Sequence, residues 1–143
     1  MRLFTSFWSN PELRVLDAVI VSISRGEPRW PLPFTYRRIR ELAPDNETWK
    51  HQDRDSFERS YITQLEKVGA TAILERLERI SGTRRPVVML CWERPDAEYC
   101  HRWTLSRFIE RDAGITVPEL RAEMLANRPN SPQLTLFDER GGA

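Results

Sequence analysis

The residues best suited to chemistry are three neighbours, Cys100, His101 and Arg102, which follow an apolar run that ends at Cys91. We expect them to begin a helix, where unpaired backbone N–H groups favour anions and lower the pKa of a cysteine. His101 exchanges a proton near pH 7, and Arg102 can hold a phosphate or carboxylate at two points. Glu93 adds a second acid or base. The pattern predicts a nucleophile, a proton carrier and an anion clamp in one region.

Two of these residues also have a purely structural interpretation. On a helix, His101 shares a face with Leu105 and Phe108, which is typical of a histidine packed into the core. Cys91 ends an apolar strand, where a cysteine often serves as a small hydrophobic side chain. The sequence alone leaves both interpretations open.

A metal site is the remaining alternative for the same residues. Cys91, Cys100 and His101 would supply three ligands, and a fourth such as Glu93 or His51 would be needed. The spacing is Cys-x8-Cys-His, without the close Cys-x-x-Cys pair that many metal and redox sites carry. The pattern therefore favours neither a metal nor a redox pair and identifies no cofactor.

The elements around these residues predict an α/β domain. Residues 18–23 and 86–91 are apolar at successive positions, as in strands buried on both faces of a parallel sheet, and residues 3–5 suggest a first strand. Helices are expected over residues 11–16, 53–68, 70–80, from about 96 or 100 to 112, and 118–125. The last of these follows a capping box, Thr116-Val117-Pro118-Glu119. This alternation indicates a small open sheet with parallel pairs, flanked by helices.

Ligands of such sheets bind beyond the carboxyl ends of the strands, which here are residues 5–6, 22–25 and 91–93. The long segment 24–44 that follows one of these ends is predicted to be an ordered loop. Its aromatic side chains either stack on bases or anchor the loop to the core. They are Trp30, Phe34 and Tyr36.

Arginine dominates the cations of this chain. Of 22 Lys and Arg residues, only Lys50 and Lys67 are lysines, and the net charge is +1. A GC-rich genome explains such a bias, and so does phosphate recognition, because guanidinium binds oxyanions in a fork. One cluster supports the second interpretation, since residues 25–40 contain a single acid, Glu27, among five arginines. These are Arg25, Arg29, Arg37, Arg38 and Arg40.

Several segments together resemble the bacterial domain-of-unknown-function 488 family. They are residues 5–10, 21–26, 36–38, 42–44, 90–93 and 100–102, within a resemblance that covers about residues 3 to 115. The resemblance implies a compact Rossmann-like α/β domain and a site location, but no established reaction. By position, its motif residues here would be Ser9, Asn10, Ser24, Arg25, Cys91, Glu93, Cys100, His101 and Arg102. Trp92 departs from the small residue of many members, which affects the shape of the pocket.

The composition changes after residue 126, which predicts one domain over 1–126 and a flexible tail over 127–143. A proline-rich stretch leads into Gln133-Leu134-Thr135-Leu136-Phe137, which resembles the peptide that binds the bacterial DNA sliding clamp. In this interpretation Leu136 and Phe137 fill an apolar pocket while the Gln133 amide makes polar contacts. A terminal strand that packs on its own domain is the alternative.

Hydrophobic segments and cysteines indicate where in the cell the protein is located. No run of 18 apolar residues and no secretory signal is present, so we expect no membrane span and a cytoplasmic location. Two cysteines are too few for a disulfide scaffold and are expected to be reduced.

Three hypotheses follow from the sequence. The first is an enzyme directed at a nucleotide or nucleic acid and recruited to the sliding clamp, in DNA repair or modification. Its catalytic residues would be Cys100, as thiolate or ligand, His101 and Glu93, and its anion or substrate contacts Ser9, Asn10, Ser24, Arg25, Arg37, Cys91 and Arg102. The second is a non-catalytic adaptor that binds DNA or protein and is tethered to the clamp. The third is a small metal- or redox-linked regulator.

Overall fold

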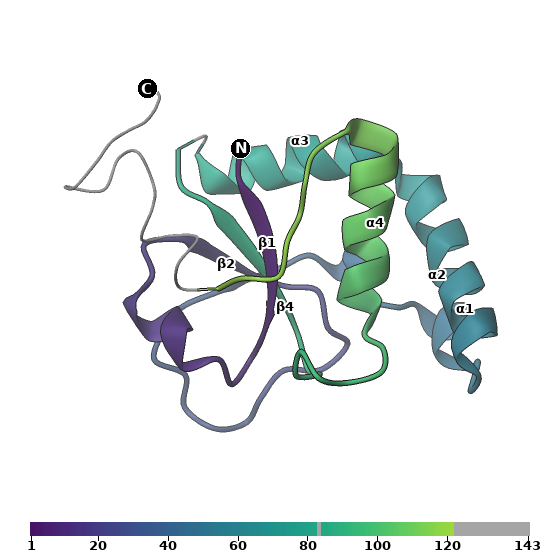
Figure 1. Ribbon diagram of the computed structural model, residues 1–143, viewed down its shortest axis with the longest axis horizontal. Coiled ribbons are helices and arrows are strands. Elements are labelled where there is room, and N and C mark those ends of the chain that lie inside the picture. The colour runs from purple at the N-terminus through teal and green to yellow at the C-terminus, as the bar shows by residue number, and fades with distance from the viewer. Residues whose placement is uncertain (83, 122–143) are drawn as a thin grey trace.

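The computed structural model describes residues 1–82 and 84–121, within which four parallel strands form one sheet (Figure 1). The strands are β1 (Leu3–Phe7), β2 (Val19–Ser22), β3 (Arg37–Arg38) and β4 (Val87–Cys91), in the order β1-β4-β2-β3. The α-helices are α1 (Asn46–Trp49), α2 (Arg54–Val68), α3 (Ala70–Ser81) and α4 (His101–Ala113). Two 3₁₀ turns, η1 (Pro11–Val15) and η2 (Arg40–Leu42), complete the list. The expected Rossmann-like α/β fold with a parallel sheet is confirmed.

β4 lies in the interior of the sheet, hydrogen-bonded to β1 on one side and β2 on the other. All five of its residues are buried, which explains why the strand is apolar at successive positions. Val87 and Met89 pack into one hydrophobic cluster and Val88 and Leu90 into another. The alternation places the two clusters on opposite faces of the sheet.

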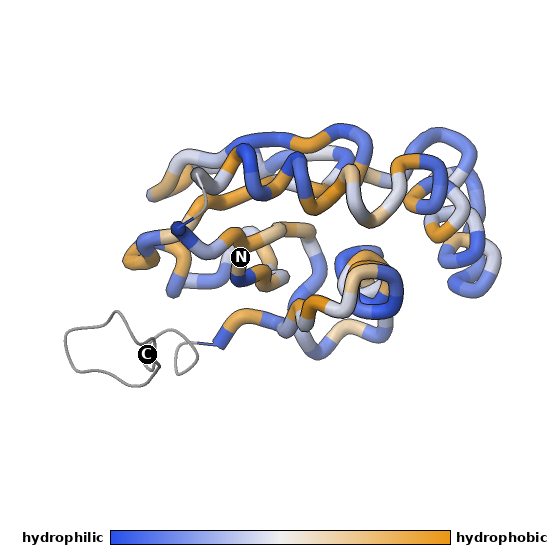
Figure 2. The backbone as a smooth tube through the Cα atoms, turned by 90° about the horizontal axis from the view of Figure 1, so that it is seen from above, coloured by the Kyte–Doolittle hydropathy of each residue, from blue (hydrophilic) through white to orange (hydrophobic). Residues whose placement is uncertain are grey.

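Three α-helices supply the cluster on the first face. α2 contributes Tyr61 and Leu65, α3 contributes Ile73 and Leu77, and α4 adds Leu105 among others. These residues recur at helical spacing, and hydrophobic and hydrophilic colours alternate along the turns of α3 in Figure 2. This face carries α4, whose start holds two of the predicted site residues.

Among residues 1–82 and 84–121, no α-helix packs on the other face. Leu13 of η1, Trp8 after β1 and Leu120 near the end of the described chain pack there against Phe4 and Leu90, with Phe34 at the edge. Asn10 caps η1 by accepting a hydrogen bond from the Glu12 N–H at 3.0 Å. The face thus depends on irregular segments that cross it.

The predicted loop over residues 24–44 is wrong in its second half. β3 lies there and pairs in parallel with Val21 and Ser22, and η2 follows it directly. Both residues of β3 are exposed arginines, so the strand has no apolar alternation by which to recognise it. The sequence also missed α1, which Asp45 caps by accepting from the Thr48 N–H at 2.8 Å.

The predicted helix over 118–125 is wrong over its described part, residues 118–121. This segment instead runs extended beside β1, where the Thr5 N–H donates to the Pro118 carbonyl and the Leu120 N–H donates to the Thr5 carbonyl. Figure 1 shows it crossing β1 after α4. Burial of Leu120 and the pairing of Glu119 with Arg102 outweigh the local capping pattern. No helix within the described ranges is both long and apolar enough to span a membrane.

Candidate functional site

A cleft of about 460 Å³ opens at the carboxyl ends of β2 and β4. Segments 24–26 and 91–93, which follow these strands, form part of its wall, and the start of α4 forms another part. The helical side contributes residues around α1 and the start of α2. The cleft therefore lies at the edge of the sheet where parallel α/β folds bind ligands. It is lined by Ser24, Arg25, Gly26, Trp49, Gln52, Asp53, Arg54, Phe57, Cys91, Trp92, Glu93, Tyr99, Cys100 and His101.

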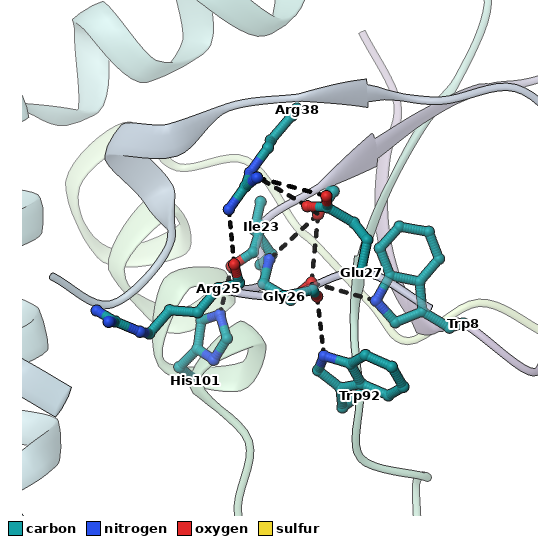
Figure 3. A network of polar contacts seen from close by, with 10 residues as sticks. Trp8, Ile23, Arg25, Gly26, Glu27, Arg38, Trp92 and His101 are labelled. Atoms are coloured by element: carbon teal, nitrogen blue, oxygen red, sulfur yellow. Dashed lines mark hydrogen bonds and ion pairs between the residues drawn. The ribbon is translucent and has the colours of Figure 1, made fainter. Parts of the chain in front are cut away.

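Two sulfurs and an imidazole meet in the cleft. The potential ligand atoms of Cys91, Cys100 and His101 all lie within 4.8 Å of one another, and all three residues are buried. The Cys91 sulfur is 3.3 Å from Nδ1 of His101. Nε2 of His101 lies 2.6 Å from the Ile23 carbonyl, which can only accept, so Nε2 carries a hydrogen. In the neutral ring Nδ1 is therefore the nitrogen that carries the lone pair, and the Cys91 sulfur lies over the ring, 3.3 Å from Nδ1 and 3.7 Å from Nε2 (Figure 3 shows the Ile23 contact).

The fold brings these residues together through two neighbouring elements. Cys91 is the last residue of β4, and Cys100 occupies the N-cap position of α4, so His101 is its first residue. The Cys100 side chain makes no capping hydrogen bond, which leaves its sulfur available to the cluster. The ring of Tyr61 meets the His101 ring edge to face at 5.2 Å and fixes it from the α2 side. The sequence prediction that these residues share one region agrees with this geometry.

The electrostatics of the two cysteines differ. A hydrogen bond from the Cys91 thiol lowers the pKa of Cys100 most, and His101 lowers it further, against the opposing effect of burial. Burial raises the pKa of Cys91, and the neighbouring Cys100 raises it again. Burial and the nearby Cys100 charge also raise the pKa of Glu93. Of the two cysteines, Cys100 is thus the one that loses its proton more readily, and the nearby Glu93 carboxyl group retains its proton more readily than usual.

Aromatic rings line the mouth of the cleft. Phe57 contacts Trp49 at 6.2 Å and Tyr99 at 6.0 Å between ring centroids. The Arg25 guanidinium lies over Trp49 at 5.0 Å, and that of Arg54 lies over Tyr99 at 5.2 Å. Trp49 is more than half exposed, so its ring is accessible to a ligand. Flat apolar surfaces and two cations therefore face one opening.

The turn of residues 24–27, whose first three residues line the cleft, is fixed by polar contacts drawn in Figure 3. The indole N–H of Trp92 donates to the Gly26 carbonyl at 2.9 Å. Arg38 donates to the Arg25 carbonyl at 2.6 Å and forms an ion pair with Glu27 at 3.1 Å. β3 therefore contributes to the site by holding this turn, although Arg38 does not line the cleft.

Arg102 lies apart from the cleft. Its side chain is completely buried and forms two hydrogen bonds to Glu119, at 3.1 and 2.9 Å. A third goes to the carbonyl of Glu93 at 2.6 Å. The guanidinium expected to hold a ligand anion is thus engaged by the chain itself, and it ties the segment after β4 to the segment after α4.

Other predicted residues lie elsewhere. Ser9 is exposed, and buried Asn10 donates to the Ser6 hydroxyl at 2.9 Å. Arg37 is exposed on β3, and none of the three lines the cleft. His51, considered as a fourth metal ligand, lies 3.9 Å from Glu47, away from the cysteines.

The sequence missed the helical wall of the cleft. Trp49, Arg54, Phe57 and Tyr99 line it, yet none was a candidate site residue. Trp49 carried a signal, because a tryptophan in the polar run Glu47-Thr48-Trp49-Lys50 has few apolar neighbours to bury it. Phe57 precedes Tyr61 and Leu65 at helical spacing on α2, which is typical of a core residue, but only the latter two are buried.

A model of the family described as Domain of unknown function DUF488 matches residues 29–109. Comparison with curated proteins and with solved structures gave no match. The matched segment contains Cys91, Glu93, Cys100 and His101 and begins after Arg25. The predicted clamp-binding residues lie outside the described part of the chain. They are Gln133, Leu134, Leu136 and Phe137.

Proposed function

This chain belongs to the family Domain of unknown function DUF488, and from that premise and the cleft we propose that it is an enzyme acting on a nucleotide or a base of nucleic acid. One observation carries the proposal: a cysteine of lowered pKa lies in the same cleft as exposed aromatic rings and arginines. The rings and cations recognise the ligand. The group of Cys91, Cys100 and His101, called the sulfur cluster below, makes the site reactive.

The recognition surface suits a base with its phosphate. Trp49 offers a face for stacking, which is the general means by which proteins hold single bases. Arg25 and Arg54 flank this surface, and guanidinium groups bind phosphate oxygens at two points. The cleft volume falls in the range of small-molecule sites.

The reactive side of the cleft suits group transfer or hydrolysis. Cys100 supplies a sulfur that is deprotonated more readily than a free thiol. Glu93 lines the cleft beside it and, because its pKa is raised, can deliver or accept a proton nearer neutral pH. The His101 ring packs against the Cys91 sulfur, and its Nε2 is held by the Ile23 carbonyl.

Binding is tested by titrating the full chain with AMP, GMP, CMP and TMP while tryptophan fluorescence is measured. We expect quenching, because Trp49 and Trp92 line the cleft, and a weaker effect from ribose 5-phosphate. Arg54→Ala should weaken binding about tenfold, the value of one charge-assisted contact. Arg59→Ala is the matched control on the same helix, since Arg59 does not line the cleft. A protein that binds neither mononucleotides nor a short single-stranded DNA would contradict the proposal.

Catalysis is tested by incubating the protein with those ligands and following products by mass spectrometry. Cys100→Ser should abolish turnover while circular dichroism and fluorescence binding show an intact, ligand-competent fold. Binding with no product from any ligand would instead favour the non-catalytic adaptor that the sequence left open.

We further propose recruitment to the bacterial DNA sliding clamp through Gln133-Leu134-Thr135-Leu136-Phe137. The support is the sequence match, in which two apolar side chains and one amide provide the contacts. A pull-down with the purified clamp should retain the full chain and lose it with Leu136→Ala plus Phe137→Ala. Asp138→Ala, adjacent to the peptide, is the matched control. Equal retention of all three proteins would rule out this mode of recruitment.

A further inference from the structure

Cys91, Cys100 and His101 are residue types that bind metals, and their ligand atoms lie as close together as those of a metal site. Their ligand atoms come from β4 and the start of α4 and approach within 4.8 Å of one another. In a tetrahedral zinc site, the usual Zn–S and Zn–N lengths place ligand atoms about 3.5–3.8 Å apart. The 3.3 Å separation of the Cys91 sulfur and Nδ1 of His101 is close to that value.

The outer side of His101 provides a second, independent observation. Histidines that bind metals commonly donate their other ring N–H to a carboxylate or backbone carbonyl, which fixes the tautomer and ring orientation. Nε2 of His101 does this toward Ile23 at 2.6 Å, so Nδ1 is the ring nitrogen left with a lone pair for a metal. Tyr61 packs edge to face on the same ring. The imidazole is therefore held in the tautomer in which Nδ1 can bind a metal.

We propose that Cys91, Cys100 and His101 bind one zinc ion whose fourth position opens into the cleft. All three residues line the cleft, so the open position faces the space where a ligand would lie. Soft thiolate ligands with imidazole select zinc among the common divalent ions, and three protein ligands with one free position are typical of catalytic zinc. Glu93 lies beside this position, with one carboxylate oxygen 3.9 Å from the Cys91 sulfur.

The inference deepens the proposed function, and its catalytic part rests on that function. With zinc present, Cys100 is a ligand rather than a nucleophile, and the reactive species is a zinc-bound water of lowered pKa. In hydrolysis, this water transfers a proton to Glu93 and its oxygen bonds to the electrophilic atom of the substrate. The bond to the leaving group breaks, and the leaving group receives the proton from Glu93. Water is the only co-reactant.

Metal binding is measured on the full chain without any nucleotide. Purified protein should contain about one equivalent of zinc by elemental analysis, in line with a single site. After removal of zinc by a chelator, titration with Co²⁺ should produce near-ultraviolet thiolate-to-cobalt absorption and the visible bands of tetrahedral cobalt. His101→Gln and Cys100→Ser should weaken Co²⁺ binding more than tenfold, whereas His51→Gln, which changes the histidine near Glu47, should leave the spectrum unchanged.

A folded wild-type protein that contains no zinc and gives no thiolate–cobalt absorption would overturn the proposal. So would a cobalt spectrum that survives both ligand substitutions in proteins with native circular dichroism. If these variants do not fold, the wild-type spectrum decides alone, because thiolate absorption can arise only from the cysteines, which are Cys91 and Cys100. Nucleotide binding by the metal-free protein separately reports on the proposed function, so the two failures are distinguishable.

Discussion

Arg102 has no exposed side-chain surface, yet it carries a full positive charge. Glu119 compensates this charge through two hydrogen bonds, and the Glu93 carbonyl satisfies a further N–H. Glu119 also accepts from the Thr5 hydroxyl at 2.8 Å and the Trp103 indole at 3.1 Å. A single carboxylate therefore links β1, α4 and the segment that follows α4.

At the scale of the residue, we predict that Glu119→Gln lowers the free energy of unfolding by about 3 kcal/mol, because it leaves the buried guanidinium uncompensated. Denaturation by urea, followed by circular dichroism at pH 7, measures the loss. Asp112→Asn is the matched control, since its partner Arg111 is exposed and such surface pairs contribute about 0–1 kcal/mol. Equal losses in the two variants would contradict the role assigned to Glu119.

At the scale of the element, Glu58 connects α2 to α4. Its carboxylate accepts hydrogen bonds from the Thr104 hydroxyl at 2.7 Å and from Arg107 at 2.5 Å. Partial burial alone would raise the pKa of Glu58, but these two hydrogen bonds outweigh burial and lower the pKa below its ordinary 4.5. The charged form of Glu58 is therefore the one that joins the helices.

The sign of this shift fixes a pH dependence. A carboxyl group whose pKa is lower in the folded state adds stability above its unfolded pKa, and that stability is lost as pH falls through the folded value. Glu58→Gln should destabilise the protein at pH 7, and the difference from wild type should shrink below pH 4.5. Urea unfolding across this pH range tests it, with exposed Glu66→Gln on the same helix as control. A difference that does not vary with pH would show that charge is not the cause.

The junction of α2 and α3 depends on a single glycine. Gly69 has φ +89, a conformation that side chains with a Cβ rarely adopt, although nothing lies within 4 Å of an added Cβ. Gly69→Ala should therefore cost about 1–2 kcal/mol through backbone strain alone. Gly26→Ala, where space is also open and φ is not in this region, should change stability by less than about 0.5 kcal/mol. Thermal unfolding by circular dichroism compares the two, and a neutral Gly69→Ala would refute the strain.

The elements differ in how far local sequence determines them. β2, β4, α2, α3 and α4 were predictable because burial imposes a periodicity on their residues. β3 was not predictable from the sequence. Its two residues are exposed arginines that pair with β2 through backbone hydrogen bonds, and such pairing imposes no pattern on the side chains. Residues 118–121 were mispredicted because a correct capping signal competes with pairing to β1 more than a hundred residues earlier.

The residues of the candidate site also divide into those that local sequence identifies and those that only the tertiary fold identifies. Cys91 and Cys100 were recognisable because their types carry chemistry and flank a strand end and a helix start. Arg102 was assigned to the cleft because it directly follows Cys100 and His101. Its partner Glu119 lies 17 residues further along the chain, so the local sequence does not reveal the pair. Trp49 and Tyr99 reach the cleft from distant segments, so only the tertiary fold identifies them.

At the scale of the whole molecule, the domain is larger than the family match. The match spans residues 29–109, yet β1 pairs with β4 over five residues and β2 pairs with β4 over four. Residues 117–120 then pack against β1 from the other end of the chain. The matched segment contains the sulfur cluster, whereas both β1 and the segment after α4 complete the sheet and its second face.

The second face offers a test of whether the molecule unfolds as one unit. Leu120 is 5% exposed and packs with Trp8, Phe4 and Leu13 on the face where the described part of the chain places no α-helix. Leu120→Ala should lower the free energy of unfolding by about 2–4 kcal/mol, the usual cost of removing a buried leucine side chain. Val15→Ala in the adjacent η1 is the control, since Val15 is 77% exposed.

Fluorescence of Trp8, in a background where the other four tryptophans are replaced by phenylalanine, and far-ultraviolet circular dichroism should report the same lowered midpoint for Leu120→Ala. Trp8 lies on the second face and the α-helices lie on the first, so coincident transitions mean that loss of the C-terminal contact destabilises both faces together. A fluorescence change that precedes the loss of helical signal would instead show that the second face opens independently. In that case β4 alone, buried from both sides, would not couple the two clusters, and stability of the sulfur cluster beside it would be insensitive to Leu120.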